Sequence, residues 1–215
     1  MSDASLFPLF LKLEGKRCLV VGAGLIGLEK VESLLRCAAS IHVIAPHAVA
    51  RVQELSSTGR IDWLARNYDP ADVIGCDLVI AATNDREVNR AVFEEATRHR
   101  ILCNTADDPP LCDFFFGSIV QRGDLQIAIS TSGQSPALAQ RLRREIDAQL
   151  PADLGTWLDD LGQLRREVLQ AMPAGPERKA LLHELAHREV CGSPGCPARA
   201  YAAATIAERK PEVPQ

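Results

Sequence analysis

The sequence has no apolar run long enough to cross a membrane, and its first residues lack the basic start of a secretory signal peptide. Positive charge is not in excess either, because 24 Lys and Arg stand against 28 Asp and Glu, for a formal net charge of −4. This balance argues against general binding to nucleic acid or to a membrane surface. We therefore expect a cytoplasmic protein with no nucleic-acid partner and no membrane partner.

A disulfide framework and internal repeats are also lacking. The seven cysteines are an odd number. Five of them lie in apolar stretches, namely Cys18, Cys37, Cys76, Cys103 and Cys112. Reduced thiols in a core explain these positions better than disulfides do. With 215 residues, of which 47% are hydrophobic, the chain can bury one globular core and carry a smaller appendage.

The most informative feature present is a glycine motif near the start of the chain. An apolar strand runs into Gly22, Gly24 and Gly27, at the G-x-G-x-x-G spacing of a dinucleotide-binding turn. Gly22 would make the tight turn, Gly24 would let the backbone approach a pyrophosphate, and Gly27 would let the next helix pack on the strand. The N-terminus of that helix would point its amides at the phosphates. A tight turn without a ligand is the alternative, and the context favours nucleotide binding.

Strand and helix patterns alternate through the first 113 residues. The predicted strands cover 17–21, 41–45, 61–64, 78–82 and 102–104, and the predicted helices cover 25–37, 47–58 and 86–99. Such alternation with short connections predicts an α/β fold, a Rossmann-like, doubly wound parallel sheet.

The pattern changes after residue 113. Two apolar stretches, 114–122 and 125–130, predict a hairpin rather than a crossover. Ser135 and Pro136 then open a predicted helix that reaches residue 150, as N-cap and first helical residue. We expect four parts, listed by range: a nucleotide-binding domain over 1–113, a small α+β region over 114–150, a helical C-terminal domain over 151–190 and a poorly ordered tail over 191–215.

Polar residues follow two of the predicted strands at their carboxyl ends, where open α/β sheets bind ligands. Thr83 and Asn84 follow one strand and are expected to line the cofactor. Asp107 and Asp108 follow the next, where a carboxylate would serve as a general base. A solvated turn is the alternative for the two aspartates.

One residue of the usual NAD site is missing. An acidic residue about 20 positions after the glycines normally holds the ribose. Here that place reads Ile44-Ala45-Pro46-His47, and the nearest arginine that could take a 2′-phosphate is Arg51. We expect backbone groups around Pro46 and His47 to serve the ribose instead, so this position does not decide between NAD and NADP.

Residues 183–187, His-Glu-Leu-Ala-His, match the pattern of zinc hydrolases. Glu189, Cys191 or Cys196 would have to supply a third ligand. An exposed helix face is the better explanation of this short match, and we expect no metal site.

The order of these features resembles the precorrin-2 dehydrogenase/sirohydrochlorin ferrochelatase family, which includes the N-terminal module of bifunctional siroheme synthases. The resemblance covers about residues 6–170. It rests on six segments: Phe7 to Phe10, Val20 to Gly24 with Lys30, Ala81 to Asp85 with Asn89, Cys103 to Pro109, Phe114 to Val120, and Ile129 to Ala139.

The resemblance implies a cytoplasmic homodimer that uses NAD to oxidise precorrin-2 to sirohydrochlorin, with Fe2+ as a further substrate in the members that make siroheme. Asp107 falls on the family's catalytic aspartate. Leu25, Ile26, Pro46 and His47 fall on its cofactor contacts, and residues 114–150 match its dimerisation region. A dehydrogenase without chelatase activity and a non-catalytic NAD-binding sensor remain as alternatives.

The implied substrate carries many carboxylates, so a protein of net negative charge needs local cations to bind it. Arg122, Arg141, Arg143 and Arg144 are candidates, and a solvated helix face is the alternative for them. We expect the substrate-binding residues to include Asn104, Ser132, Gly133 and Arg141. Two departures from the family pattern are Thr131, where a serine is usual, and His47, where a glutamate is frequent.

Overall fold

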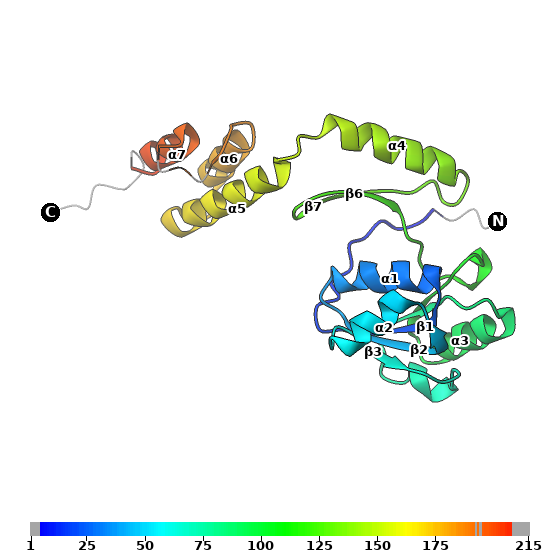
Figure 1. The fold of residues 1–215 in the computed structure, drawn as a ribbon. Helices are drawn as coiled ribbons and strands as arrows, with labels where there is room; N and C mark the ends of the chain where they lie inside the picture. The colour runs from blue at the N-terminus through cyan, green and yellow to red at the C-terminus, as the bar shows by residue number, and fades with distance from the viewer. Residues whose placement is uncertain (1–4, 192, 194, 208–215) are drawn as a thin grey trace. The chain divides into compact units, whose positions relative to one another are not determined.

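The structure, a computed structural model, describes residues 5–191, 193 and 195–207. The chain forms two compact units that divide between Phe116 and Gly117 (Figure 1). The domain boundaries expected near residues 113, 150 and 190 remain a prediction.

The first unit contains a five-stranded parallel sheet with the strand order β3-β2-β1-β4-β5. Its strands are β1 (Arg17–Ala23), β2 (Ser40–Ala48), β3 (Asp62–Leu64), β4 (Leu78–Ala81) and β5 (Leu102–Thr105). This arrangement confirms the predicted Rossmann-like fold. The order reverses beside β1, the place where open α/β sheets form their ligand-binding crevice.

Helices cover both faces of this sheet. Successive side chains of a strand point to opposite faces, so each strand contributes apolar side chains to both layers. Cys18 and Val20 of β1 pack in one apolar cluster with residues of α1 (Leu25–Leu35) and α2 (Ala50–Ser57). Leu19 and Val21 pack in a second cluster with α3 (Arg86–Arg98) and the short 3-10 helix η1 (Pro70–Val73). The sheet is therefore buried between two layers.

The second unit begins with an antiparallel hairpin of β6 (Ser118–Arg122) and β7 (Leu125–Ile129). Helix α4 (Pro136–Gln149) follows, and the Ser135 hydroxyl accepts a hydrogen bond from the Leu138 amide at 3.2 Å, as the predicted N-cap requires. The predicted start of the first strand at residue 114 is wrong. Residues 114–116 instead pack within the first unit, where the Phe114 and Phe116 rings meet edge to face at 5.5 Å.

Three helices complete the second unit: α5 (Leu154–Ala171), α6 (Pro176–Leu185) and α7 (Pro197–Ala207). They share their own apolar core, which includes Leu164, Leu185 and Cys196. The prediction of a poorly ordered tail is therefore wrong for 197–207. Alanine is the strongest helix former, and Ala198 and Ala202 of α7 are buried in this core. Residues 192, 194 and 208–215 of that predicted tail lie outside the described residues.

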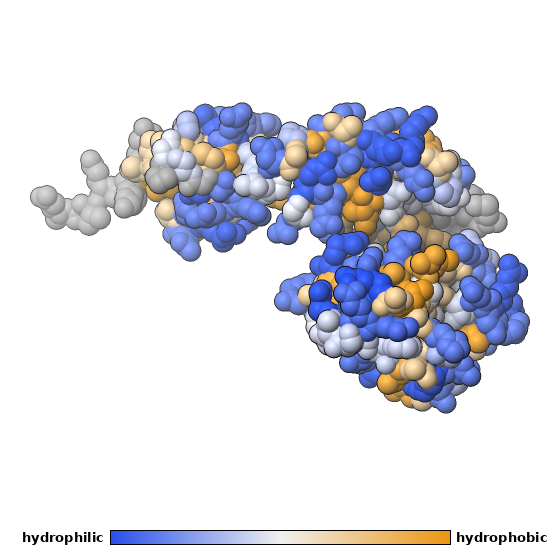
Figure 2. Space-filling model, in the orientation of Figure 1, coloured by the Kyte–Doolittle hydropathy of each residue, from blue (hydrophilic) through white to orange (hydrophobic). Residues whose placement is uncertain are grey.

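All seven cysteines are free, as expected. Cys18, Cys76 and Cys103 are buried, but Cys37 is exposed because it lies in the turn after α1, and Cys196 is a core residue. Within the residues that the structure describes, no helix is long and apolar enough to cross a membrane. Apolar patches do interrupt the polar surface (Figure 2), and large exposed apolar side chains include Phe7, Phe10 and Leu25.

Candidate functional site

The three glycines of the motif have different physical requirements. Gly22 has φ +107°, and a Cβ atom there would lie 2.4 Å from the Ala82 carbonyl oxygen. A Cβ at Gly27 would lie 2.2 Å from the Gly22 carbonyl oxygen. The fold itself therefore needs these two glycines. A Cβ at Gly24 would meet nothing within 4 Å, so the open space there is available to a ligand.

The start of α1 is suited to an anion with an adjoining flat group. Gly24 is the N-cap and supplies no side chain to the first-turn amides, and that turn contains no acidic residue. The positive end of the helix dipole is therefore uncompensated from within the element. Leu25, which is 78% exposed, and Ile26 provide apolar surface beside it. These residues fit the phosphates and a ring of a dinucleotide.

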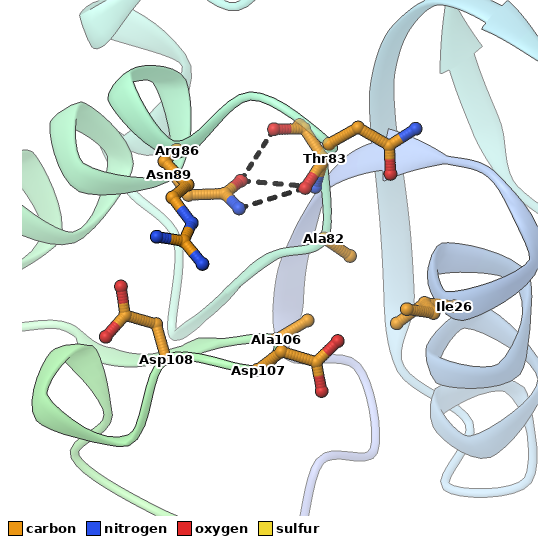
Figure 3. A pocket seen from close by; sticks show the side chains of 9 residues that line it. Ile26, Ala82, Thr83, Arg86, Asn89, Ala106, Asp107 and Asp108 are labelled. Carbon is orange, nitrogen blue, oxygen red and sulfur yellow. Dashed lines mark hydrogen bonds between the residues drawn. The ribbon is translucent and has the colours of Figure 1, made fainter.

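The carboxyl ends of β1, β4 and β5 meet at one edge of the sheet. The Ala82 amide donates to the Val21 carbonyl at 2.7 Å, and the Ala106 amide donates to the Ala81 carbonyl at 2.8 Å. A cavity of about 240 Å³ opens at this edge (Figure 3). Its lining residues are Ile26, Ala82, Thr83, Asn84, Arg86, Asn89, Ala106, Asp107 and Asp108.

A hydrogen-bond network fixes one wall of the cavity. Asn89 is 6% exposed, and its amide group donates to the Thr83 carbonyl at 3.0 Å and accepts from the Thr83 amide at 3.1 Å. Asp85 caps α3 by accepting from the amides of Glu87 and Val88. The turn from β4 into α3 is thus held at both ends, which keeps Thr83 and Asn84 beside the cavity. Their contact with the cofactor remains a prediction.

The opposite wall is a loop that leaves β5 and is tied at its base. The Cys103 amide donates to Asp113 Oδ2 at 2.9 Å, and the Asp113 amide donates back to the Cys103 carbonyl at 2.8 Å. Cys112 Sγ donates to the Thr105 carbonyl at 3.1 Å, and burial raises the pKa of this thiol, which keeps it protonated as a donor. These hydrogen bonds fix the base of the loop, and Asp107 lies at its tip.

Asp107 lies at that tip with φ +60°, a left-handed conformation that Asp tolerates better than most residues. Its carboxylate is exposed, and in Figure 3 it is turned toward the side of the cavity where Ile26 lies. The Arg86 and Asp108 side chains reach toward each other at the other end. An accessible carboxylate beside the glycine turn can accept a proton from a bound substrate.

The remaining cofactor residues expected from the sequence lie at the end of β2. Pro46 and His47 are exposed there, next to Ala48, which pairs with Ala23 of the glycine turn. Arg51 forms an ion pair with Glu54 at 2.7 Å, so its charge is already used on the surface.

The residues expected to bind substrate divide between the two units. Asn104 is 6% exposed, and its amide donates to the Phe114 carbonyl at 2.8 Å, which is a structural use of this side chain. Ser132, Gly133 and Arg141 belong to the second unit. Arg141 forms an exposed ion pair with Glu145 at 3.3 Å, and Arg122 pairs with Asp147 at 2.7 Å.

Four lining residues did not figure among the expected site residues: Ala82, Arg86, Asn89 and Ala106. Of these, Asn89 supports the wall, and Arg86 brings a cation to the cavity. Asn89 belongs to a segment that carries the family resemblance, whereas the signal for Arg86 in the sequence is its position in the helix that begins after the fourth strand.

The zinc interpretation of residues 183–187 finds no support. His183 lies in the last turn of α6, but His187 lies beyond its end at Leu185, and Glu184 pairs with Arg188 at 2.9 Å. Across the described part of the chain, no group of three His, Cys, Asp or Glu side chains could hold a metal ion.

Comparison with known proteins identifies relatives of both units. A family described as "Putative NAD(P)-binding" matches residues 9–118, and one described as "Sirohaem biosynthesis protein central" matches residues 122–149. Siroheme synthase 1 of Serratia proteamaculans is 41% identical over 172 residues, 80% of this chain and 36% of that protein. Siroheme synthase 1 of Cronobacter sakazakii is 43% identical over 158 residues, 74% of this chain and 34% of that protein. The chain thus spans about a third of the length of these relatives.

A solved structure shares the fold. It is SirC, a precorrin-2 dehydrogenase, which matches with a TM-score of 0.76 at 24% sequence identity over 94% of this chain and 100% of that one. The likeness to this structure shows the fold, and the match of the NAD(P)-binding family over residues 9–118 shows the family. The chain belongs to the NAD(P)-binding family that forms the N-terminal module of siroheme synthases.

Proposed function

We propose that this protein oxidises precorrin-2 to sirohydrochlorin with NAD+ as the cofactor. The observation that carries the proposal is the cavity that joins the helix of the glycine turn, through Ile26, to the loop that carries Asp107. A dinucleotide site and an accessible carboxylate are thereby brought to one place. The names of the relatives, siroheme synthase and precorrin-2 dehydrogenase, supply the substrate.

Different residues of the chain would have different roles in this oxidation. The first-turn amides of α1 would bind the cofactor phosphates, and Gly24 would leave room for them. When bound, NAD+ supplies the acceptor for the hydride that the reduced tetrapyrrole loses. Asp107 would accept the proton that the tetrapyrrole loses in the same oxidation, so charge and electrons balance. The Thr83 and Asn89 network would keep the wall of the site in place.

The end of β2 favours NAD+ over NADP+. No arginine precedes Arg51 after the strand, and Arg51 is paired with Glu54. A 2′-phosphate would find no free guanidinium there, whereas a 2′-hydroxyl needs none.

Insertion of Fe2+ into sirohydrochlorin is a second candidate reaction, with iron as a substrate. Two observations favour it: the relatives are named siroheme synthases, and Asp107 and Asp108 both line the cavity. The macrocycle must lose two pyrrole protons as iron enters, and the carboxylates of Asp107 and Asp108 would accept one proton each.

We also infer a homodimer in the cytoplasm. A two-stranded sheet such as β6 and β7 is only marginally stable by itself, and Ile119 of β6 is 45% exposed. A second copy packed on the hairpin would bury this surface. Seven free thiols suit a reducing compartment.

The experiment that tests the oxidation uses the purified protein with precorrin-2 and NAD+. We expect NADH and sirohydrochlorin to form in equal amounts. Tight NAD+ binding without turnover would instead identify a sensor. Addition of Fe2+ to sirohydrochlorin without NAD+ then separates the two activities, since a protein that leaves sirohydrochlorin metal-free is a dehydrogenase only.

A further inference from the structure

We propose that Arg86 binds a carboxylate side chain of the tetrapyrrole. This inference rests on the proposed function and concerns the same cavity. Nine described residues line that cavity, and among them Arg86 alone is cationic, while Asp107 and Asp108 are the acidic members. A polyanionic substrate would be repelled by the two aspartates, so its entry needs a compensating positive group here.

Arg86 has no partner that would use its charge within the protein. Its neighbours in sequence are Asp85 and Glu87, but the Asp85 carboxylate caps α3. Among the described residues, no side chain forms an ion pair or a hydrogen bond with the Arg86 guanidinium, and this includes Asp108 across the cavity. The guanidinium is exposed and extends from α3 toward the loop that carries Asp108 (Figure 3).

The position of Arg86 is also locally unfavourable. It is the first residue of α3, where the helix dipole disfavours a cation by about 0.3–1 kcal/mol. A residue that violates a local rule without an internal compensation is expected at functional positions. A bound carboxylate would compensate, because it would pair with the guanidinium and face the positive end of the helix.

The cofactor is the other possible source of an anion. Its phosphates are expected at the start of α1, and in Figure 3 Ile26 of α1 and Arg86 lie at opposite sides of the cavity. The planar guanidinium also matches a carboxylate with two parallel hydrogen bonds. We therefore assign Arg86 to the substrate and not to the pyrophosphate.

The test compares Arg86→Gln with Arg90→Gln, which removes the same charge from an exposed position one turn further along α3 and outside the cavity. We expect Arg86→Gln to raise the KM for precorrin-2 and the Kd for sirohydrochlorin by about 10- to 100-fold. The Kd for NAD+ should stay within about two-fold of the wild-type value. Arg86→Lys should recover part of the loss, and Arg90→Gln should leave all three constants unchanged.

Equal losses in both arginine variants, or no change in Arg86→Gln, would overturn the assignment. Weaker NAD+ binding in Arg86→Gln alone would assign the residue to the cofactor and overturn it too. The binding measurement needs no turnover. A wild-type protein that binds sirohydrochlorin but does not oxidise precorrin-2 would contradict the proposed function. The role of Arg86 would still be tested by the ratio of the Kd values for sirohydrochlorin of Arg86→Gln and wild type. A wild-type protein that binds no tetrapyrrole would end both.

Discussion

The three glycines of the turn differ in what requires them: two are required by the fold, and one leaves space for a ligand. Gly22 and Gly27 are required because added Cβ atoms would overlap backbone atoms, whereas the space beside Gly24 is empty. The sequence spacing predicts these roles, with Gly22 and Gly27 serving the fold and Gly24 the ligand. The backbone conformation and the neighbouring atoms add the physical reason for each role.

The substitution Gly24→Ala should therefore lower the affinity for NAD+ by about ten-fold or more while the melting temperature changes by only a few degrees, because the new methyl group occupies ligand space. Gly22→Ala should instead destabilise the protein by more than about 2 kcal/mol, since the residue has φ +107° and its Cβ would overlap the Ala82 carbonyl. Calorimetric titration with NAD+ and thermal unfolding of both variants give the comparison. Similar melting temperatures for the two would contradict this division.

Arg86 and Asp107 illustrate what residue-level reasoning can predict. Asp107 was expected at the site because polar residues after parallel strands gather at one edge of the sheet. An arginine at the start of a helix looks like a solvated residue in the sequence. Its role depends on the cavity and on the lack of a partner among the described residues, and both are three-dimensional facts.

At the scale of elements, alternating strands and helices were predictable and the segments between them were not. Hydrophobic periodicity located β1 to β5 and α1 to α3 closely. Residues 114–116 were predicted as strand because they are apolar and aromatic. Their contacts are instead with side chains of the first unit: Lys30 Nζ lies 4.3 Å from the centre of the Phe116 ring. The helix α7 was missed because prolines precede and follow its alanine-rich sequence.

The 3-10 helix η1 carries a pH-dependent contribution to stability. Hydrogen bonds from Arg66 lower the pKa of Asp72 below its usual value of 3.8, and the Asp69 amide also donates to this carboxylate at 2.9 Å. A depressed pKa in the folded protein stabilises it above the unfolded pKa, and the contribution is lost as the pH falls through the folded pKa.

We expect Asp72→Asn to lower the free energy of unfolding by about 1–2 kcal/mol at pH 7, with the difference from wild type shrinking below about pH 4. Urea unfolding between neutral and acid pH measures it. The control is Asp159→Asn, an exposed carboxylate of α5 without an ion pair among the described residues, which should change little at any pH. A difference for Asp72→Asn that stays constant down to acid pH would contradict the assignment.

At the scale of the whole molecule, the two units have separate apolar cores. The clusters of the first unit contain residues of β1 to β5, and the cluster of the second contains residues of α5, α6 and α7. The doubly wound sheet was predictable because its strands and helices alternate regularly along the sequence. The packing of the C-terminal helices was not, since it depends on which small residues become buried.

Truncation of a core residue in one unit should leave ligand binding by the other intact. Leu185 is fully buried among α5, α6 and α7, so Leu185→Ala should cost about 2–5 kcal/mol in the second unit. The Kd for NAD+ should remain within about two-fold of wild type. Val92→Ala, on the buried face of α3, is the matched control and should lower the melting temperature of the unit that NAD+ stabilises. Loss of NAD+ binding in Leu185→Ala would contradict the separation of the cores.

The central claim is that Asp107 accepts a proton in an NAD+-dependent oxidation carried out beside the glycine turn. The most direct test measures the rate of NADH formation from precorrin-2 by Asp107→Asn, with Asp108→Asn as the neighbouring control. We predict that Asp107→Asn lowers the rate by about 10²- to 10⁴-fold while the Kd for NAD+ is unchanged, and that Asp108→Asn lowers it by less than about ten-fold. A wild-type rate in Asp107→Asn would contradict the account.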